Sequence, residues 1–329
     1  MNKVIEILDE DTGIDYRSVK SLLKKLNSVD EEKEKITSLT IKLNFSSISE
    51  LSEVILWRCC IYFKGFDCKK VFDISNKSSS VILAKTGFFN RLIGQNSSLL
   101  SFEKVNPLHY DIFKPYLEEG EEGSLTEEKL EEIFEDNFDK HIDNNNPFHR
   151  EARIHIKEIL NNAFDHSQVQ SDAGLICKVD EVNISFAVAD MGQGFRGSFL
   201  SNPSLKEVYN LFSDQDLLEK ATCFQVSCNP SSSPNPKYKH KNAGSGLFYL
   251  RKFVELHKNN KLVLISDKGY FYVDGQGRLK RRNLEAVKWP GAVVHFQFNK
   301  NQTKSEEYVK LCKSVYDATE IDKSYITIV

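Results

Sequence analysis

The turn after one apolar run restricts the fold of this chain more than any other feature. Val182 to Ala189 is largely apolar and ends in Asp190-Met191-Gly192-Gln193-Gly194. The run predicts a strand, and the glycines predict a tight turn whose backbone can approach a flat ligand closely. A carboxylate at a strand end can accept a hydrogen bond from an exocyclic amine, such as the N6 amine of adenine. A tight turn that carries a surface aspartate is the alternative.

The segment Gly192 to Gly197 also satisfies the dinucleotide-binding pattern G-x-G-x-x-G. That pattern requires a helix that opens at the glycines, followed by a parallel strand that ends in an acid. Ser201-Asn202-Pro203 interrupts the segment and no apolar strand follows it, so we reject a Rossmann site. The chain also contains no G-x-x-x-x-G-K-[ST] loop.

A long helix is predicted from Pro147 to about Ser167, and it has two distinct faces. Its apolar stripe follows the i, i+3, i+4, i+7 pattern of a buried face: Ile156, Ile159, Leu160 and Ala163. A second face carries polar residues at i, i+4 and i+7: Glu158, Asn162 and Asp165. Side chains four residues apart stack on a helix, so Glu158 and Asn162 point into the same space. A carboxylate can activate water and an amide oxygen suits Mg²⁺, whereas a solvated helix face is the alternative.

A second glycine turn, Asn242-Ala243-Gly244-Ser245-Gly246-Leu247, opens a helix predicted to reach His257. Free N–H groups and the positive end of the helix dipole make such a turn a phosphate site, although many such turns bind nothing. Before it, a long and mostly irregular segment from Phe195 to Ala243 is rich in Ser, Asn and Pro, with Lys241 in a basic run at its end. Because loops of this length are usually functional lids or disordered, we expect a lid that closes over a polyphosphate. A flexible surface insertion is the alternative.

Taken in chain order, these motifs resemble the GHKL superfamily of ATP-binding domains, which includes DNA gyrase B, the mismatch-repair and chaperone ATPases and the sensor histidine kinases. The N-box of that family, E-x-x-x-N-A, is matched by Glu158 to Ala163. Its glycine boxes, D-x-G-x-G and G-x-G-L, are matched by Asp190 to Gly194 and by Gly244 to Leu247. Its last strand, normally preceded by Gly-Thr, is matched by Gly291 to Phe296. The resemblance covers Phe148 to Phe298 and implies a Bergerat-type α/β sandwich, a mixed sheet with helices on one face.

The resemblance implies a role for each motif residue. Glu158 is the general base, Asn162 is the Mg²⁺ ligand and Asp190 holds the adenine amine of ATP. The other residues expected to bind the nucleotide are Asp165, Gly192, Gly194, Lys241, Gly244, Ser245, Gly246 and Leu247. The chain departs from the family at Ala292, where the family often has Thr. A hydroxyl that bridges toward Asp190 or the adenine is therefore missing, which weakens the expected affinity.

Three uses of ATP remain open. We expect a switch in which Mg-dependent ATP hydrolysis is coupled to lid closure and to binding of a protein partner, because Glu158 has the position of a residue that activates water. A serine kinase of the anti-sigma-factor type uses the same residues, and a non-catalytic ATP-sensing interaction module is the third reading. His155 lies inside the N-box helix and is poorly placed as a phosphoacceptor.

The N-terminal part predicts a smaller α/β domain. Helices at Tyr16–Leu26, Ser49–Phe63 and Ser78–Ile93 alternate with strands at Ile36–Phe45 and Lys70–Ile74. With Lys85-Thr86-Gly87-Phe88-Phe89 in the last helix, this part is similar to a STAS-type module, as in anti-sigma factor antagonists, which implies protein–protein contact. The predicted division is an N-terminal domain at 1–118, an acidic linker and helix at 119–147, the ATP-binding domain at 148–300 and a helical tail at 301–329.

The charge balance predicts no bulk attraction to nucleic acid or lipid, because 44 Lys and Arg face 47 Asp and Glu. The first residues lack the regions of a signal peptide and no apolar run is long enough to span a bilayer, so we expect a cytoplasmic protein without a membrane partner. Seven cysteines with no C-x-x-C spacing indicate reduced thiols. We expect a protein partner to bind through the N-terminal domain, and a homodimer stays open.

Overall fold

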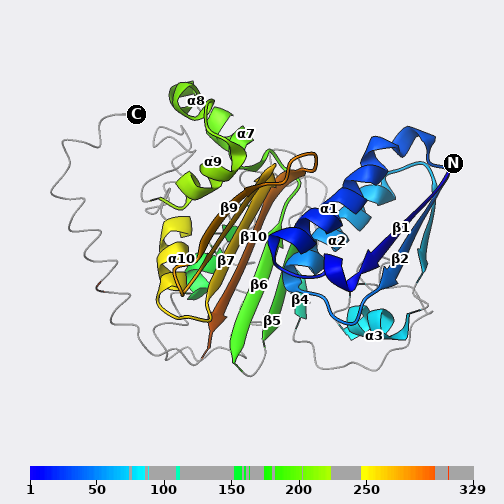
Figure 1. Ribbon diagram of the computed structural model, residues 1–329, viewed down its shortest axis with the longest axis horizontal. Coiled ribbons are helices and arrows are strands. Elements are labelled where there is room, and N and C mark those ends of the chain that lie inside the picture. The colour runs from blue at the N-terminus through cyan, green and yellow to red at the C-terminus, as the bar shows by residue number, and fades with distance from the viewer. Residues whose placement is uncertain are drawn as a thin grey trace, which may run out of the picture.

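Two sheets and the helices packed on them make up the fold (Figure 1). The computed structural model describes residues 1–73, 76–85, 88, 109–111, 152–157, 159–160, 163, 174–179, 182–201, 203–223, 246–300 and 310. Within them the protein is α/β, with a three-stranded parallel sheet and a seven-stranded antiparallel sheet. None of the helices in these ranges is long and apolar enough to cross a membrane.

The N-terminal module, the described residues up to 88, is built on the parallel sheet. Its strands are β1 (Asn2–Leu8), β2 (Ser38–Asn44) and β3 (Lys69–Asp73). Its helices are α1 (Tyr16–Glu31), α2 (Glu50–Lys64) and α3 (Lys77–Lys85), with short 3₁₀ helices at Asp9–Asp11 and Lys33–Lys35. Side chains cap the two long helices: Asp15 accepts from the N–H groups of Arg17 and Ser18, and Ser49 accepts from Ser52.

The predicted elements of this module are confirmed with shifted ends, except that residues 86–87 and 89–93 of the helix predicted at Ser78–Ile93 lie outside the described residues. The helix predicted at Tyr16–Leu26 continues to Glu31, because Val29 extends its buried stripe. The strand β1 was not predicted from the sequence. Of the predicted Lys85–Phe89 feature, Lys85 ends α3 and Phe88 is buried and helical, while 86, 87 and 89 lie outside the described residues.

The larger sheet has the order β4-β5-β6-β10-β7-β8-β9. Its strands are β4 (His109–Asp111), β5 (Gly174–Val179), β6 (Asn183–Ala189), β7 (Lys261–Asp267), β8 (Gly269–Asp274), β9 (Leu279–Asn283) and β10 (Trp289–Asn299). All pairs among these strands are antiparallel, so the predicted mixed sheet is wrong for the described residues. The physical reason is connection length, because short turns join β5 to β6 and β7 to β8 to β9, and such turns produce antiparallel pairs.

One face of the larger sheet is covered by helices of the C-terminal part. Described residues between 152 and 163 are helical, and α10 (Gly246–Glu255) lies beside them on the sheet. Three more helices are α7 (Gly194–Ser201), α8 (Pro203–Tyr209) and α9 (Asp214–Ala221), seen above the sheet in Figure 1. The prediction of a mostly irregular segment from Phe195 is therefore wrong as far as Cys223. Ser213 caps α9, and Leu217 and Leu218 are buried, so this polar sequence has enough apolar positions to form a packed helix.

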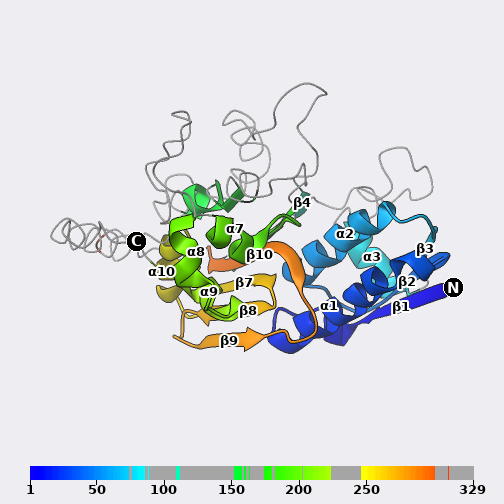
Figure 2. The ribbon, with the colours of Figure 1, turned by 90° about the horizontal axis from the view of Figure 1, so that it is seen from above.

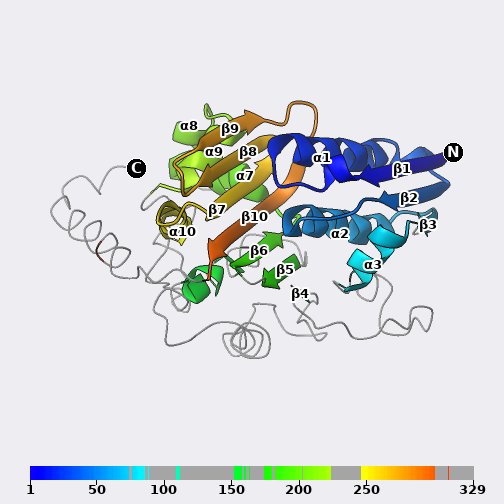
Figure 3. The ribbon, with the colours of Figure 1, turned by 60° about the horizontal axis from the view of Figure 1, so that its bottom comes forward.

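The opposite face of the sheet is covered by the N-terminal module. Helix α2 packs against β5, β6 and β10, and Figures 1 and 3 show α1 and α2 between the two sheets. One cluster of buried apolar side chains runs from β1 and β2 through α1 and α2 into the larger sheet. The described helices of the C-terminal part that pack on the sheet share one face, as predicted, and α2 of the N-terminal module covers the other face. On β6 the residues that face α2 are small, Ala187 and Ala189, which lets the helix approach closely.

Several sequence predictions lie outside the described residues. These are the acidic linker and helix at 119–147 and the helical tail at 301–329 apart from Lys310, which is helical. The predicted domain limits stay predictions.

Candidate functional site

Asp190 sits at the end of β6, where the sequence predicted it, and its carboxyl group is buried. Its backbone continues the ladder with β10, because Asp190 N–H donates to the carbonyl of Ala292 at 2.9 Å. Its Oδ1 accepts two backbone N–H bonds, from Gly192 at 2.8 Å and from Ala292 at 3.3 Å. No described residue donates a hydrogen bond to Oδ2. Backbone N–H groups of the described residues therefore hold one of the two carboxylate oxygens.

Burial sets the protonation behaviour of this carboxyl. Only 6% of Asp190 is exposed, and desolvation raises its pKa to about 6. The N–H groups of Gly192 and Ala292 and the positive charge of Arg58 act in the opposite direction but do not offset the burial. The group is thus a buried carboxyl that titrates near neutral pH.

Gly291 and Trp289 enclose Asp190 from the side of β10. A Cβ at position 291 would lie 2.2 Å from the carbonyl oxygen of Asp190 and 2.5 Å from its Oδ1, so only glycine allows this approach. The indole Nε1 of the buried Trp289 donates to the same carbonyl at 2.8 Å. Gly291 and Trp289 of β10 therefore together fix the position of Asp190.

In the glycine turn that follows Asp190, Gly194 has a left-handed backbone, with φ of 65°. A Cβ there would lie 2.5 Å from Ser266 Oγ, and Ser266 Oγ also accepts from Phe195 N–H at 3.0 Å. Helix α7 opens at Gly194, as the dinucleotide pattern requires, and it ends at Ser201. The neighbours of β6 are both antiparallel, so no parallel strand follows and a Rossmann site remains excluded.

The predicted N-box helix is confirmed in its apolar stripe. Ile156, Ile159, Leu160 and Ala163 are buried against β6, β10 and α10. Glu158, Asn162 and Asp165 lie outside the described residues. His155 is buried between the rings of Tyr249 and Phe253, and burial lowers its pKa to about 4. That His155 is not a phosphoacceptor stays a prediction.

The second glycine turn leads into α10 as predicted, because Gly246 is the first residue of that helix. Leu247 and Phe195 pack against the same small cluster of Phe199, Leu217 and Ala221, so the starts of α7 and α10 lie close together. Two helix starts that are far apart in sequence are thus brought toward one region. Lys241, Gly244 and Ser245 lie outside the described residues.

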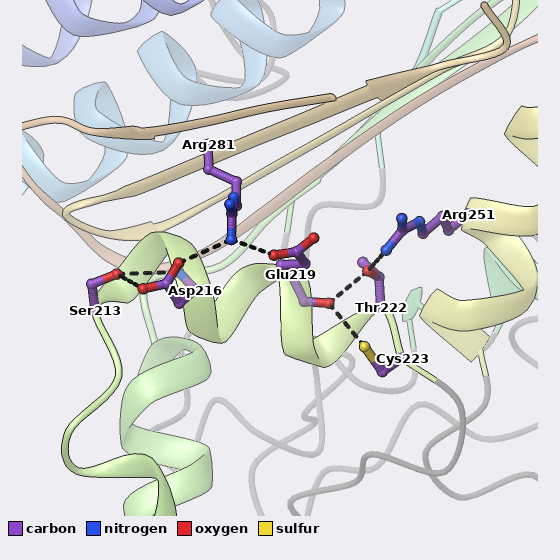
Figure 4. A network of polar contacts seen from close by, with 7 residues as sticks. All are labelled: Ser213, Asp216, Glu219, Thr222, Cys223, Arg251 and Arg281. Atoms are coloured by element: carbon purple, nitrogen blue, oxygen red, sulfur yellow. Dashed lines mark hydrogen bonds and ion pairs between the residues drawn. The ribbon is translucent and has the colours of Figure 1, made fainter. Parts of the chain in front are cut away.

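A polar network attaches α9 to both the sheet and α10 (Figure 4). Arg281 of β9 contacts Asp216 at 3.4 Å and Glu219 at 2.7 Å. At the end of α9, Thr222 Oγ1 accepts from Arg251 of α10 at 3.1 Å and donates to the carbonyl of Glu219 at 2.7 Å. The chain therefore leaves α9 beside the helix that Gly246 begins.

The site contains two residues that sequence reasoning missed, Ser266 and Asp267 at the end of β7. Ser266 is the ladder partner of Ala292, so a hydroxyl lies in the same row as Asp190 although Ala292 carries none. Burial and the charge of Asp214 raise the pKa of Asp267 to about 6. Polar residues at the end of a strand form no recognisable sequence motif. Only the strand register could therefore have revealed Ser266 and Asp267.

No cluster of three or more His, Cys, Asp or Glu side chains that could hold a metal occurs within the described ranges. A scan against protein-family models finds no match to the chain, and searches of curated proteins and of solved structures find none either.

Proposed function

We propose that the chain is a GHKL-type ATP-binding switch that takes Mg²⁺ with the nucleotide. The observation that carries the proposal is the buried carboxyl group of Asp190, with one oxygen bonded to two backbone N–H groups and no described donor at the other. A buried carboxylate without a full set of donors is costly. An adenine amine that donates to Oδ2 would remove part of that cost and would hold the group in its charged form.

The two glycine turns support the same ligand. Gly194 opens α7 with a left-handed backbone four residues after Asp190, so a base held by Asp190 would lie close to this helix start. Gly246 opens α10, and the N-terminal end of a helix favours a phosphate. Because the starts of α7 and α10 pack on one cluster, base and phosphates of one nucleotide would reach both turns.

For the use of the ATP we propose hydrolysis coupled to lid closure and to binding of a protein partner, with Glu158 activating water and Asn162 binding Mg²⁺. These two roles rest on the resemblance of the N-box. Transfer of the phosphoryl group to a serine of a partner, or sensing of ATP without chemistry, would use the same nucleotide site.

The substitution Asp190→Asn tests nucleotide binding. Asn keeps Oδ1 as the acceptor for Gly192 and Ala292, but its NH₂ group would face the adenine amine, donor against donor. A mismatch of this kind costs about 1–3 kcal/mol, so the affinity for Mg·ATP in calorimetry should fall by about tenfold or more. The matched control is Asp274→Asn at the end of β8, whose carboxylate is occupied by Tyr272 and Arg278. Unchanged affinity in Asp190→Asn would remove the proposal.

The substitution Glu158→Ala separates the three uses of ATP. If Glu158 activates water, hydrolysis should drop by about 10²–10⁴-fold while Mg·ATP binding stays near wild type. Asn162→Ala should instead lose Mg²⁺-dependent affinity, because the metal bridges protein and phosphates. A kinase would label a partner protein and release little phosphate, and a sensor would give neither product. Wild-type turnover by Glu158→Ala contradicts the hydrolysis model.

A further inference from the structure

Helix α1 holds the connection between β9 and β10 along one of its faces. Tyr16 Oη donates to the carbonyl of Asn283 at 2.8 Å, and Lys20 Nζ pairs with Glu285 Oε2 at 2.8 Å. One end of the connection is thus bound to the first two turns of α1. Figure 2 shows the connection passing beside this helix.

The far end of the connection is bound to the same helix, because Asn27 Oδ1 accepts from the backbone N–H of Lys288 at 2.9 Å. Between these contacts Leu284 and Val287 are buried in the core that the module shares with the larger sheet. Glu285 has a left-handed backbone, with φ of 62°, which a non-glycine residue adopts only where its surroundings impose it. Residues 283–288 are therefore shaped by the N-terminal module.

Trp289 follows this connection directly and reaches the candidate nucleotide site. Its indole N–H donates to the carbonyl of Asp190 at 2.8 Å, and its ring belongs to the shared core. Ala292, three residues further along β10, donates to the carboxyl of the same aspartate. A displacement of the connection would therefore change both the backbone and the carboxyl contacts of Asp190.

We propose that Trp289 is a positioning residue through which the N-terminal module holds Asp190, so that docking of α1 and occupancy of the nucleotide site are coupled. This inference rests on the proposed function for its ligand, an adenine nucleotide. Coupling of this kind is reciprocal. ATP should stabilise the contacts of α1, and any partner that displaces α1 should weaken ATP binding.

The test replaces Trp289 with Phe, which removes the indole donor and keeps an aromatic ring in the core. Loss of one such hydrogen bond should weaken Mg·ATP affinity by about 3- to 10-fold. The matched control is Trp57→Phe, because Trp57 of α2 is the other tryptophan of the chain and is buried in the same core. A second variant, Asn27→Ala, cuts the link to Lys288 far from the nucleotide and should weaken affinity in the same direction by a smaller factor.

A second readout needs no nucleotide. The Asp190 carboxyl, followed by NMR, should titrate at a pH that differs from wild type by half a unit or more in Trp289→Phe, whereas Trp57→Phe should keep the wild-type midpoint. Equal midpoints in wild type and Trp289→Phe, or equal shifts in both variants, overturn the inference. If wild-type protein binds no ATP, the proposed function fails, and this titration still decides whether Trp289 positions Asp190.

The reciprocal effect is measured by amide hydrogen exchange. Saturating ATP should slow exchange in residues 16–27 of the wild-type protein, and this protection should disappear in Trp289→Phe at equal saturation. Protection that persists in Trp289→Phe contradicts coupling through this residue.

Discussion

The two faces of the β6–β10 strand pair differ in chemistry although they share one backbone. Toward the helices around 152–163 and α10 the face is large and apolar, with Phe186, Phe296 and Phe298. Toward α2 the side chains are smaller, with Ala187, Ala189 and Val293, and they include the fully buried polar His295. Because residues alternate between the faces of a strand, one sequence encodes both surfaces. The first face forms a core, and the second forms an interface with a separate module.

Each face has a buried carboxylate near it, and the two carboxylates behave in opposite ways. Glu50 of α2 lies 3.6 Å from His295 Nε2 and 3.6 Å from Lys178 Nζ. Burial raises its pKa, but His295 and Lys178 outweigh burial and bring the pKa to about 2. Asp190 is bonded to backbone N–H groups, and burial raises its pKa to about 6. The first carboxylate is neutralised within the protein, whereas the second is suited to a donor from a ligand.

The largest effect is expected on the apolar face. Phe296 is fully buried, and its ring lies 5.2–5.5 Å from those of Phe186, Phe253 and Phe298. Phe296→Ala should lower the free energy of unfolding by about 3–5 kcal/mol, measured by urea denaturation at pH 7. The control is Phe296→Leu, which should lower the free energy of unfolding by clearly less than Phe296→Ala does. A loss below about 1.5 kcal/mol for the alanine variant would show that this face is not the main core.

On the face toward α2, loss of the Glu50 charge should lower the free energy of unfolding. Glu50 has its pKa lowered from 4.5 to about 2, so its contribution is present above about pH 4.5 and is lost as the pH falls toward 2. Glu50→Gln should therefore cost about 3 kcal/mol at pH 7, and the variant should lose less stability than wild type between pH 5 and 2. Urea denaturation at several pH values measures both effects. Parallel stability curves for wild type and variant would contradict a charged Glu50 that is held by His295 and Lys178.

The contribution of Asp190 to stability should depend on pH with the opposite sign to that of Glu50. Because its pKa is raised from 3.8 to about 6, its favourable contribution is full below about pH 4 and is lost as the pH rises through about 6. Asp190→Asn removes the buried charge and keeps the acceptor for Gly192 and Ala292. The variant without nucleotide should therefore be more stable than wild type at pH 7 by about 1–3 kcal/mol, with little difference at pH 4. A destabilised variant at pH 7 would mean that the charge is compensated within the protein, as at Glu50.

The apolar strand before Asp190 and the apolar helix stripe could be predicted from local pattern, because their periodicity appears in the sequence itself, whereas the antiparallel pairing of the larger sheet was not predicted. The strand ending at Asp190 and the helix opening at Gly246 are both in the predicted places. The docking of α2 on β6 could not be predicted, because Ala187 and Ala189 look unremarkable until a helix lies over them. Ser266 and Trp289 were missed for a related reason, since only the register of β7 and β10 brings them to Asp190. Helices α7 and α9 were missed because a Ser- and Asn-rich composition outweighed a few apolar positions.

The smallest expected effect is on nucleotide affinity, whose pH dependence should follow the ionisation of Asp190 and not that of Glu50. In the proposed site an adenine amine would donate to the charged form of Asp190, so nucleotide binding would require the ionised carboxyl and would lower its pKa. With a pKa of about 6 in the free protein, most of Asp190 is ionised at pH 7 and about a tenth at pH 5. The Kd for Mg·ATP should therefore rise about tenfold from pH 7 to pH 5, measured by calorimetry, beyond the change in Asp190→Asn, in which only the phosphate ionisation remains. Glu50→Gln is the control, and it should show the same pH dependence of binding as wild type, because a group with a pKa of about 2 does not titrate in this range. A pH-independent Kd in the wild type would place the adenine amine on another acceptor.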